Sequence, residues 1–159
     1  MSWRPSLYHC GIEPQWIDYN GHLRDAYYTL VFSQAADALM DEVGLDQAYR
    51  AGTGCTLYTL EMHMHYLNEV KSTDVISVRA RALAVDAKRL HLALALHCER
   101  LAEPAALGEF MLLHVQQGST VKSAAFPPEI RQRLADWQAQ DALLPLPPLG
   151  SRRLELPRR

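Results

Sequence analysis

The sequence predicts an α+β domain in which an antiparallel sheet of about five strands wraps around one long central helix. Two observations carry this prediction. Apolar residues recur at three- and four-residue spacing over residues 25–43, as they do along the buried stripe of a helix. Several later segments alternate apolar and polar residues as strands do. A lone helix with an apolar stripe must bury that stripe against one face of such a sheet.

The long helix is predicted from Asp25 to Val43. Gly44 follows the last apolar position and supplies the stop that many helix C-termini use. Ahead of the helix, either Asn20 or Asp25 is a candidate cap, depending on where the first turn begins. The segment "WIDYNGHLRDAYY" is therefore expected at a helix N-terminus.

Strands are predicted at about residues 56–66, 74–86, 89–100 and 107–117, after a short first strand, whereas "QAYRAGTGC" shows no clear pattern. Short turns that contain Asp86 and Pro104 favour antiparallel hairpins. A second helix is expected in "PPEIRQRLADWQAQDALL", where Pro128 suits a first helical turn. We expect a single domain over residues 1–142 and a proline- and arginine-rich C-terminal tail over residues 143–159.

The composition favours a soluble, cytoplasmic protein. Hydrophobic residues make up 48% of the 159 residues and charged residues 21%, and no apolar run approaches the roughly 20 residues of a membrane span. The first residues lack the apolar core of an export signal. A formal net charge of −2 predicts neither nucleic acid nor membrane as a partner. Cys10, Cys55 and Cys98 are widely spaced, so we interpret them as reduced, packed thiols.

An acid, an amide and an imidazole alternate at Asp18, Asn20 and His22, and a helix follows directly. This "DYNGHLRDAYYTLVF" segment, with the later "MHMHYLNEV" and "TDVISVRA", resembles the hotdog-fold thioesterase superfamily, in particular its 4-hydroxybenzoyl-CoA thioesterase-like branch. The resemblance spans nearly the whole domain. It implies the hotdog fold and hydrolysis of a short or small acyl-CoA thioester to a free acid and CoA. It also implies no metal, no cofactor beyond the CoA of the substrate, and self-association as a dimer or tetramer.

The motif departs from that branch, because Trp16 stands where many members carry their first acid. The Asp-x-Asn-x-His arrangement is instead similar to that of plant acyl carrier protein thioesterases, in which the three side chains form the catalytic group. By this match the catalytic roles fall on Asp18, Asn20 and His22. Those relatives carry a further acid just before a tyrosine on the next strand, and His65 occupies that place here.

Thioester hydrolysis needs a nucleophile and donors for the developing oxyanion. Asp18 would act on water as a general base or attack the carbonyl directly. Asn20 would orient the water, and the His22 imidazole would share proton transfer. Without the resemblance, these residues would be interpreted as ordinary helix caps and a packed histidine.

A helix N-terminus offers unpaired backbone N–H groups and the positive end of the helix dipole. Gly21 allows close approach of the backbone. The predicted oxyanion donors are therefore the amides from His22 to Asp25, including that of Arg24.

The segment is also similar to thioesterase domains found beside or fused to L-carnitine dehydrogenases, which are associated with betainyl-CoA hydrolysis in carnitine catabolism. Aromatic rings attract quaternary ammonium groups by cation–π interaction, and Asp25 would add a counter-charge. The candidate rings are Tyr8, Trp16, Tyr19, Tyr27 and Tyr28. Each of them could instead pack the helix against the sheet.

Three polar residues on one strand complete the predicted substrate pocket, namely Glu61, His63 and His65. Together with His22 they could also be read as zinc ligands, although the resemblance implies no metal. The phosphates of CoA would require basic residues, for which Arg79, Arg81, Lys88 and Arg89 are available.

Two other functions fit the same sequence. A hotdog-fold hydratase or dehydratase would use an Asp and His pair for proton transfer next to a thioester, and a non-catalytic domain would only bind acyl-CoA. Release of free thiol from acyl-CoA separates hydrolysis from both.

Overall fold

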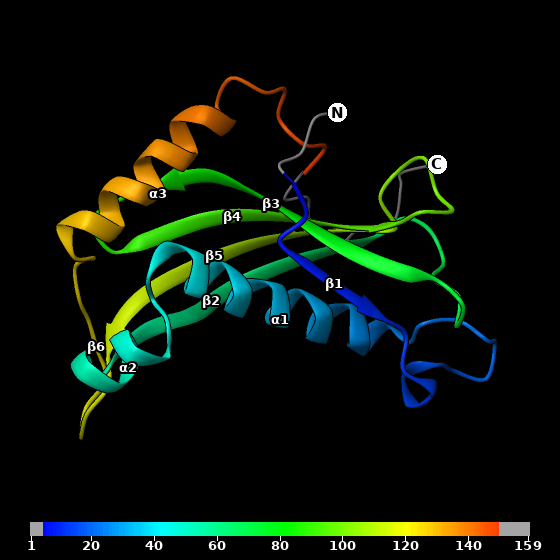
Figure 1. The fold of residues 1–159 in the computed structure, drawn as a ribbon, viewed down its shortest axis with the longest axis horizontal. Coiled ribbons are helices and arrows are strands. Elements are labelled where there is room, and N and C mark those ends of the chain that lie inside the picture. The colour runs from blue at the N-terminus through cyan, green and yellow to red at the C-terminus, as the bar shows by residue number, and fades with distance from the viewer. Residues whose placement is uncertain (1–4, 150–159) are drawn as a thin grey trace, which may run out of the picture.

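A computed structural model describes residues 5–149, and its centre is a curved six-stranded antiparallel sheet around one helix (Figure 1). Five strands follow the order β1-β3-β4-β5-β2, and the short β6 pairs with β5. The strands span Tyr8–Gly11 (β1), Cys55–Tyr66 (β2), Val75–Val85 (β3), Arg89–Cys98 (β4), Ala106–Gln116 (β5) and Lys122–Ser123 (β6). The predicted α+β architecture and its four long strands are confirmed.

The helices span Asp25–Val43 (α1), Gln47–Thr53 (α2) and Pro128–Asp141 (α3), and a 3-10 turn covers Pro14–Trp16. The sequence predicted α1 and α3 but not α2. None of the seven residues of α2 is buried, so it has no apolar periodicity to detect. It is defined by its ends instead, since Asp46 accepts the Tyr49 N–H at 2.8 Å and Gly54 adopts the left-handed conformation.

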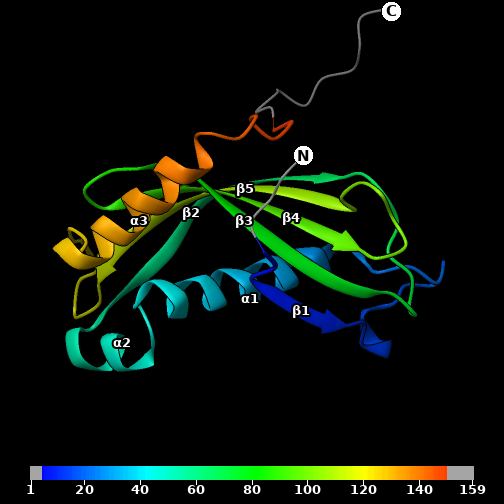
Figure 2. The ribbon, with the colours of Figure 1, turned by 45° about the horizontal axis from the view of Figure 1, so that its top comes forward.

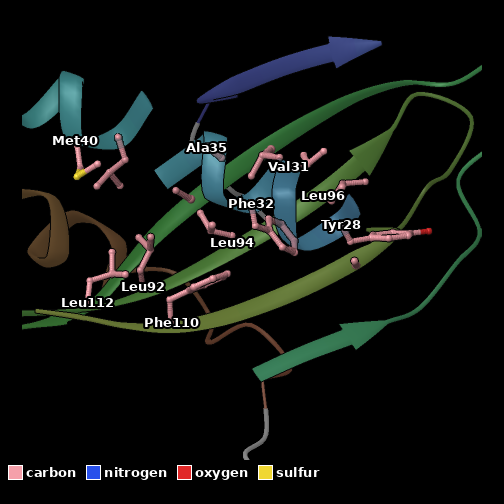
Figure 3. Close-up of a cluster of buried hydrophobic side chains, with 14 of the residues drawn as sticks. Tyr28, Val31, Phe32, Ala35, Met40, Leu92, Leu94, Leu96, Phe110 and Leu112 are labelled. Carbon is pink, nitrogen blue, oxygen red and sulfur yellow. The ribbon is translucent and has the colours of Figure 1, made fainter. Parts of the chain in front are cut away.

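Burial of one face of α1 against the sheet forms the core (Figure 3). The Phe32 ring meets the Phe110 ring edge-on, with centroids 5.9 Å apart. Fully burying one such side chain is worth roughly 1.5–3 kcal/mol. The buried positions of α1 are Tyr28, Val31, Phe32, Ala35, Leu39, Met40 and Val43. They hold the helix in one orientation, and Gly44 ends it at φ 94°, as predicted.

The start of α1 differs from the prediction, because neither Asn20 nor Asp25 is the N-cap. That position belongs to Arg24, which is extended and makes no side-chain cap. The Arg24 N–H donates to the Trp16 carbonyl at 2.9 Å, and the Leu23 N–H donates to the Val70 carbonyl at 2.8 Å. These bonds keep the chain extended up to Arg24, so the helix begins only at Asp25.

The strand β2 lies at one edge of the sheet and, among the described residues, pairs only with β5. A register shift between Thr59 and Glu61 bends it. Leu60 is 56% exposed and Met62 36% exposed on this 12-residue strand. Long edge strands with exposed apolar side chains favour pairing with another chain.

At the opposite edge, α3 lies along β3, above the sheet in Figure 2, where α1 lies below it. The pairing with β1 covers only the first part of β3. Farther along, the buried Asp141 carboxylate accepts the Ala82 N–H at 2.8 Å. Arg81 is also buried and donates to the carbonyls of Asp141, Leu144 and Pro145. Arg81 therefore anchors the C-terminal segment. The sequence analysis had named it as available for CoA phosphates, and its side chain is instead used within the fold.

The described part of the predicted tail ends at Leu149, which packs beside Ala93, Ala95 and Leu107. Residues 150–159 of that tail lie outside the described residues. The three cysteines are unpaired thiols, as predicted. Across residues 5–149, no helix combines the length and apolar character needed to cross a membrane.

Replacing Asp141 with alanine should leave the buried Ala82 N–H without an acceptor. We expect the free energy of unfolding, measured by urea denaturation, to fall by about 1–3 kcal/mol. Asp136→Ala on the exposed side of the same helix is the control and should change it by less than about 0.5 kcal/mol. Equal losses in the two variants would contradict this role for Asp141.

Candidate active site

Residues 17–23 form a narrow turn directly before α1. The Asp18 N–H donates to the His22 carbonyl at 2.9 Å, and the Gly21 N–H donates to the Asp18 carbonyl at 3.1 Å. Gly21 adopts a φ of 80°, a left-handed conformation that side chains with a Cβ rarely take. The glycine is thus required by the turn itself.

The Asp18 carboxylate is held inside this turn. Its Oδ1 accepts the Asn20 N–H at 2.8 Å and the His22 N–H at 3.2 Å. The hydrogen bond from the His22 backbone lowers the pKa of the Asp18 carboxyl, and those from Asn20 lower it further against a smaller opposing effect of burial. The same two hydrogen bonds therefore shape the turn and favour the ionised form of this carboxylate.

The His22 side chain meets an acid that the sequence analysis missed. Its Nε2 lies 3.1 Å from Oε2 of Glu69, which follows β2 in the chain. A carboxylate only accepts, so Nε2 carries the hydrogen in this contact. A bridge between His22 and Lys71 brings the two segments together. No local pattern identifies Glu69, because its place depends on the path of residues 67–71.

His65, by contrast, points away from this site. It pairs in register with Leu107, and its neighbour Tyr66 faces α1. His65, which takes the place of the further acid of the plant relatives, thus lies on the face of the sheet opposite this site. Glu69, three residues after Tyr66, reaches His22 instead.

A hollow of about 380 Å³ opens at the N-terminal end of α1. The turn before the helix supplies one wall, and Tyr66 and the following segment supply the other. Its lining includes Asp18, Asn20, His22, Asp25, Tyr28, Tyr66 and Glu69. The three predicted catalytic residues are thus brought together in one hollow.

Two tyrosines form an ordered corner of this hollow. The rings of Tyr28 and Tyr66 meet edge-on, with centroids 5.2 Å apart. The Tyr66 hydroxyl donates to the Asp25 carbonyl at 3.3 Å, and the Tyr28 hydroxyl donates to the Asn68 carbonyl at 3.4 Å. Burial raises the pKa of the Tyr66 hydroxyl, and the negative charge of Asp25 adds to the effect.

The other predicted aromatic residues do not line the hollow. Trp16 is buried in the core and stacks on Tyr27 with ring centroids 5.6 Å apart. Tyr8 donates its hydroxyl to Gln34 at 2.8 Å, and the Tyr19 side chain is 95% exposed. Of the predicted rings only Tyr28 lines this site. Trp16 and Tyr27 are packing residues, which was the alternative interpretation of these rings.

Glu61, His63 and His65 lie on the face of the sheet opposite α1. They pair in register with Met111, Glu109 and Leu107, whereas the intervening Met62 pairs with Phe110, which packs on α1. The His63 imidazole contacts the Glu61 carboxylate at 3.0 Å, and neither residue lines the hollow at the start of α1. The described residues contain no group of three or more His, Cys, Asp or Glu placed to hold a metal ion.

Most of the predicted oxyanion donors are already occupied. The amide of His22 bonds to Asp18, and the amides of Leu23 and Arg24 bond to carbonyl groups. The Asp25 side chain accepts the Ala26 N–H at 2.9 Å. Within residues 5–149, the Asp25 N–H is the amide of this series that has no acceptor. Of the amides predicted as oxyanion donors, that of Asp25 therefore remains the candidate.

Comparison with known proteins links this arrangement to thioesterases. The sequence model of the thioesterase-like superfamily matches residues 12–134. A betainyl-CoA thioesterase of Pseudomonas aeruginosa is 43% identical over 157 residues, which cover 99% of this chain and 98% of that protein. An L-carnitine dehydrogenase/betainyl-CoA thioesterase of Agrobacterium fabrum is 40% identical over 85% of this chain, which matches 27% of that longer protein.

Solved structures share the fold along nearly the entire chain. A Pseudomonas putida protein superposes with a TM-score of 0.85 at 39% identity and covers 99% of both chains. A Staphylococcus aureus protein solved in complex with CoA has a TM-score of 0.86 at 29% identity and covers 94% of both chains.

The Asp18 carboxyl should titrate below the ordinary aspartate value of about 3.9, because its ionised form accepts two backbone N–H groups. A lowered pKa means that the stabilisation is complete above the unfolded value and is lost as the pH falls through the folded value. We expect the carboxyl ¹³C shift to show this titration, and the exchange of the Asn20 and His22 amides to accelerate over the same range. A titration above the ordinary value would contradict the hydrogen-bonded geometry.

Proposed function

The chain belongs to the thioesterase-like superfamily, has its hotdog fold and is a thioester hydrolase; from this premise, we propose that its substrate is a small acyl-CoA, namely betainyl-CoA. The products would be betaine and free CoA. The observation that carries the proposal is the hollow at the start of α1, which joins an ionised Asp18 to the His22–Glu69 pair.

Two comparisons support the substrate. The Staphylococcus aureus protein with the same fold was solved with CoA bound, which supports CoA as the carrier. The Pseudomonas aeruginosa relative, which is matched along almost its full length, is named for betainyl-CoA. A hydrolase that acts on this thioester needs a nucleophilic group and a donor to the carbonyl oxygen, and Asp18 and the Asp25 N–H would supply them.

Asp18 would act on the thioester carbonyl. Its ionised carboxylate would serve either route, direct attack on the carbonyl or activation of a water as a general base, and we take direct attack as the working mechanism. Attack by its oxygen forms a mixed anhydride and releases CoA thiolate. Water then cleaves the anhydride, which gives the free acid and restores the carboxylate.

His22 and the start of α1 would assist this attack. Glu69 fixes the His22 ring through Nε2, so the imidazole is oriented to pass a proton toward the departing sulfur or from the water. The Asp25 N–H, at the positive end of the helix dipole, would donate to the oxyanion. Asn20 hydrogen-bonds the Asp18 carboxylate and would keep it oriented.

We further propose that two copies associate through β2. This edge exposes Leu60 and Met62 and has a free hydrogen-bonding side within the described part of the sheet. A groove beside it, lined by Thr29, Ser33, Asp37 and Met62 among others, runs between α1 and β2. An isologous pairing would cover this edge and groove at once.

Asp18→Asn should reduce thiol release from betainyl-CoA by about 10²–10⁴-fold, because an amide is neither a nucleophile nor a base. The turn should persist, since the amide oxygen can still accept the two N–H groups. Asp46→Asn is the matched control, because Asp46 also accepts a backbone N–H but caps α2. Its kcat should equal that of the wild type.

Steady-state assays with a thiol reagent measure both variants. Full activity in Asp18→Asn would exclude Asp18 as the reacting group. Hydration or binding of acyl-CoA by the wild type without any thiol release would instead support the hydratase or non-catalytic alternative.

Met62→Asp should prevent association, because pairing would bury a new charge at the shared edge. Sedimentation velocity should then show a dimer or tetramer for the wild type and a monomer for the variant. Val121→Asp changes an exposed valine outside β2 and should leave the assembly intact. A wild-type monomer would contradict the proposed pairing.

A further inference from the structure

The hollow at the start of α1 carries an unusual balance of charge. Its described lining contains three carboxylates, those of Asp18, Asp25 and Glu69, and no lysine or arginine. Such a lining repels an anionic acyl group or a CoA phosphate and attracts a cation. The acyl end of the substrate, rather than its nucleotide end, is therefore expected here.

Tyr66 adds an aromatic wall to the same hollow. Its side chain is half exposed at the end of β2, and its ring contacts Tyr28 edge-on at 5.2 Å. A hydrogen bond from its hydroxyl to the Asp25 carbonyl anchors it. An anchored tyrosine ring beside carboxylates is the kind of surface that binds quaternary ammonium groups.

We propose that Tyr66 and Glu69 form a subsite that selects a quaternary ammonium group on the acyl chain by its charge. This inference rests on the proposed function, since it assigns residues for substrate choice at the same site. Asp25, whose carbonyl holds the Tyr66 hydroxyl, adds a second carboxylate to the subsite.

The structure of the betainyl group requires the cation subsite to lie close to the attacking group. In betainyl-CoA one methylene carbon separates the cationic nitrogen from the thioester carbonyl. A cation subsite can therefore serve only if it shares a hollow with the attacking group, and Tyr66 and Glu69 share theirs with Asp18. Glu69 is mostly exposed, so its contact with His22 leaves it accessible to the ligand.

Trp16, Tyr19 and Tyr27 cannot take this role, although they lie closer to the motif in sequence. Trp16 and Tyr27 pack on each other, and Tyr19 projects outward from the turn. Tyr66 comes from another strand and meets the motif only through the fold.

A neutral isostere isolates the effect of charge. The 3,3-dimethylbutanoyl thioester of CoA replaces the nitrogen of the betainyl group with carbon and keeps its shape. We expect the wild type to show kcat/KM at least about tenfold higher for betainyl-CoA than for this isostere. In Tyr66→Leu and in Glu69→Gln that ratio should fall by about tenfold, the size expected for one cation contact in a partly desolvated site.

Matched variants separate charge selection from general damage. Tyr66→Phe keeps the ring and should keep the ratio, although it loses the hydroxyl bond to Asp25. Tyr19→Leu removes an exposed tyrosine, and Glu61→Gln alters a Glu–His pair on the other face of the sheet; both should keep the ratio. Because each ratio compares two substrates on one protein, a loss of folded protein cancels.

The outcomes distinguish the two proposals. Equal kcat/KM for both thioesters in the wild type would overturn the subsite and leave thioester hydrolysis intact. An unchanged ratio in both Tyr66→Leu and Glu69→Gln would also overturn it. Thiol release from neither thioester would overturn the proposed function, and the subsite with it.

Discussion

The burial of one face of α1 against the curved sheet is the constraint on which the rest of the structure depends. Phe32 and its neighbours fix the direction of the helix axis, so the N-terminus of α1 must lie where β2 ends. The turn that precedes the helix is consequently held against residues 66–71. Groups from two distant parts of the chain thereby form one hollow, with a helix N-terminus at its base.

Within that hollow, the hydrogen bonds that shape the backbone also stabilise a charge. Asp18 is a turn residue by geometry, and the N–H groups that it accepts in the turn stabilise the anion that the proposed attack requires. The capping and catalytic interpretations of this residue are thus compatible. Glu69 similarly orients His22 while adding negative charge beside Tyr66. The carboxylates of this hollow would thus serve both the attack on the thioester and the selection of the acyl group.

Periodicity predicted α1 and strands such as β3 and β4, which have buried faces, and a proline at the first helical turn indicated α3. The helix α2 has no buried residue and was missed. The motif likewise predicted that Asp18, Asn20 and His22 lie together. Glu69 and Tyr66 escaped notice as partners of that motif, since the contacts that bring them there are long-range. Glu61, His63 and His65 were grouped by their spacing alone, which fixes a shared face but does not say which face.

The most direct test of this account is a crystal structure of the Asp18→Asn variant with betainyl-CoA bound. We predict that the thioester carbonyl lies against residue 18, with its oxygen near the Asp25 N–H and the trimethylammonium group between Tyr66 and Glu69. An acyl group bound in the groove between α1 and β2, or on the face that carries His63 and His91, would contradict it.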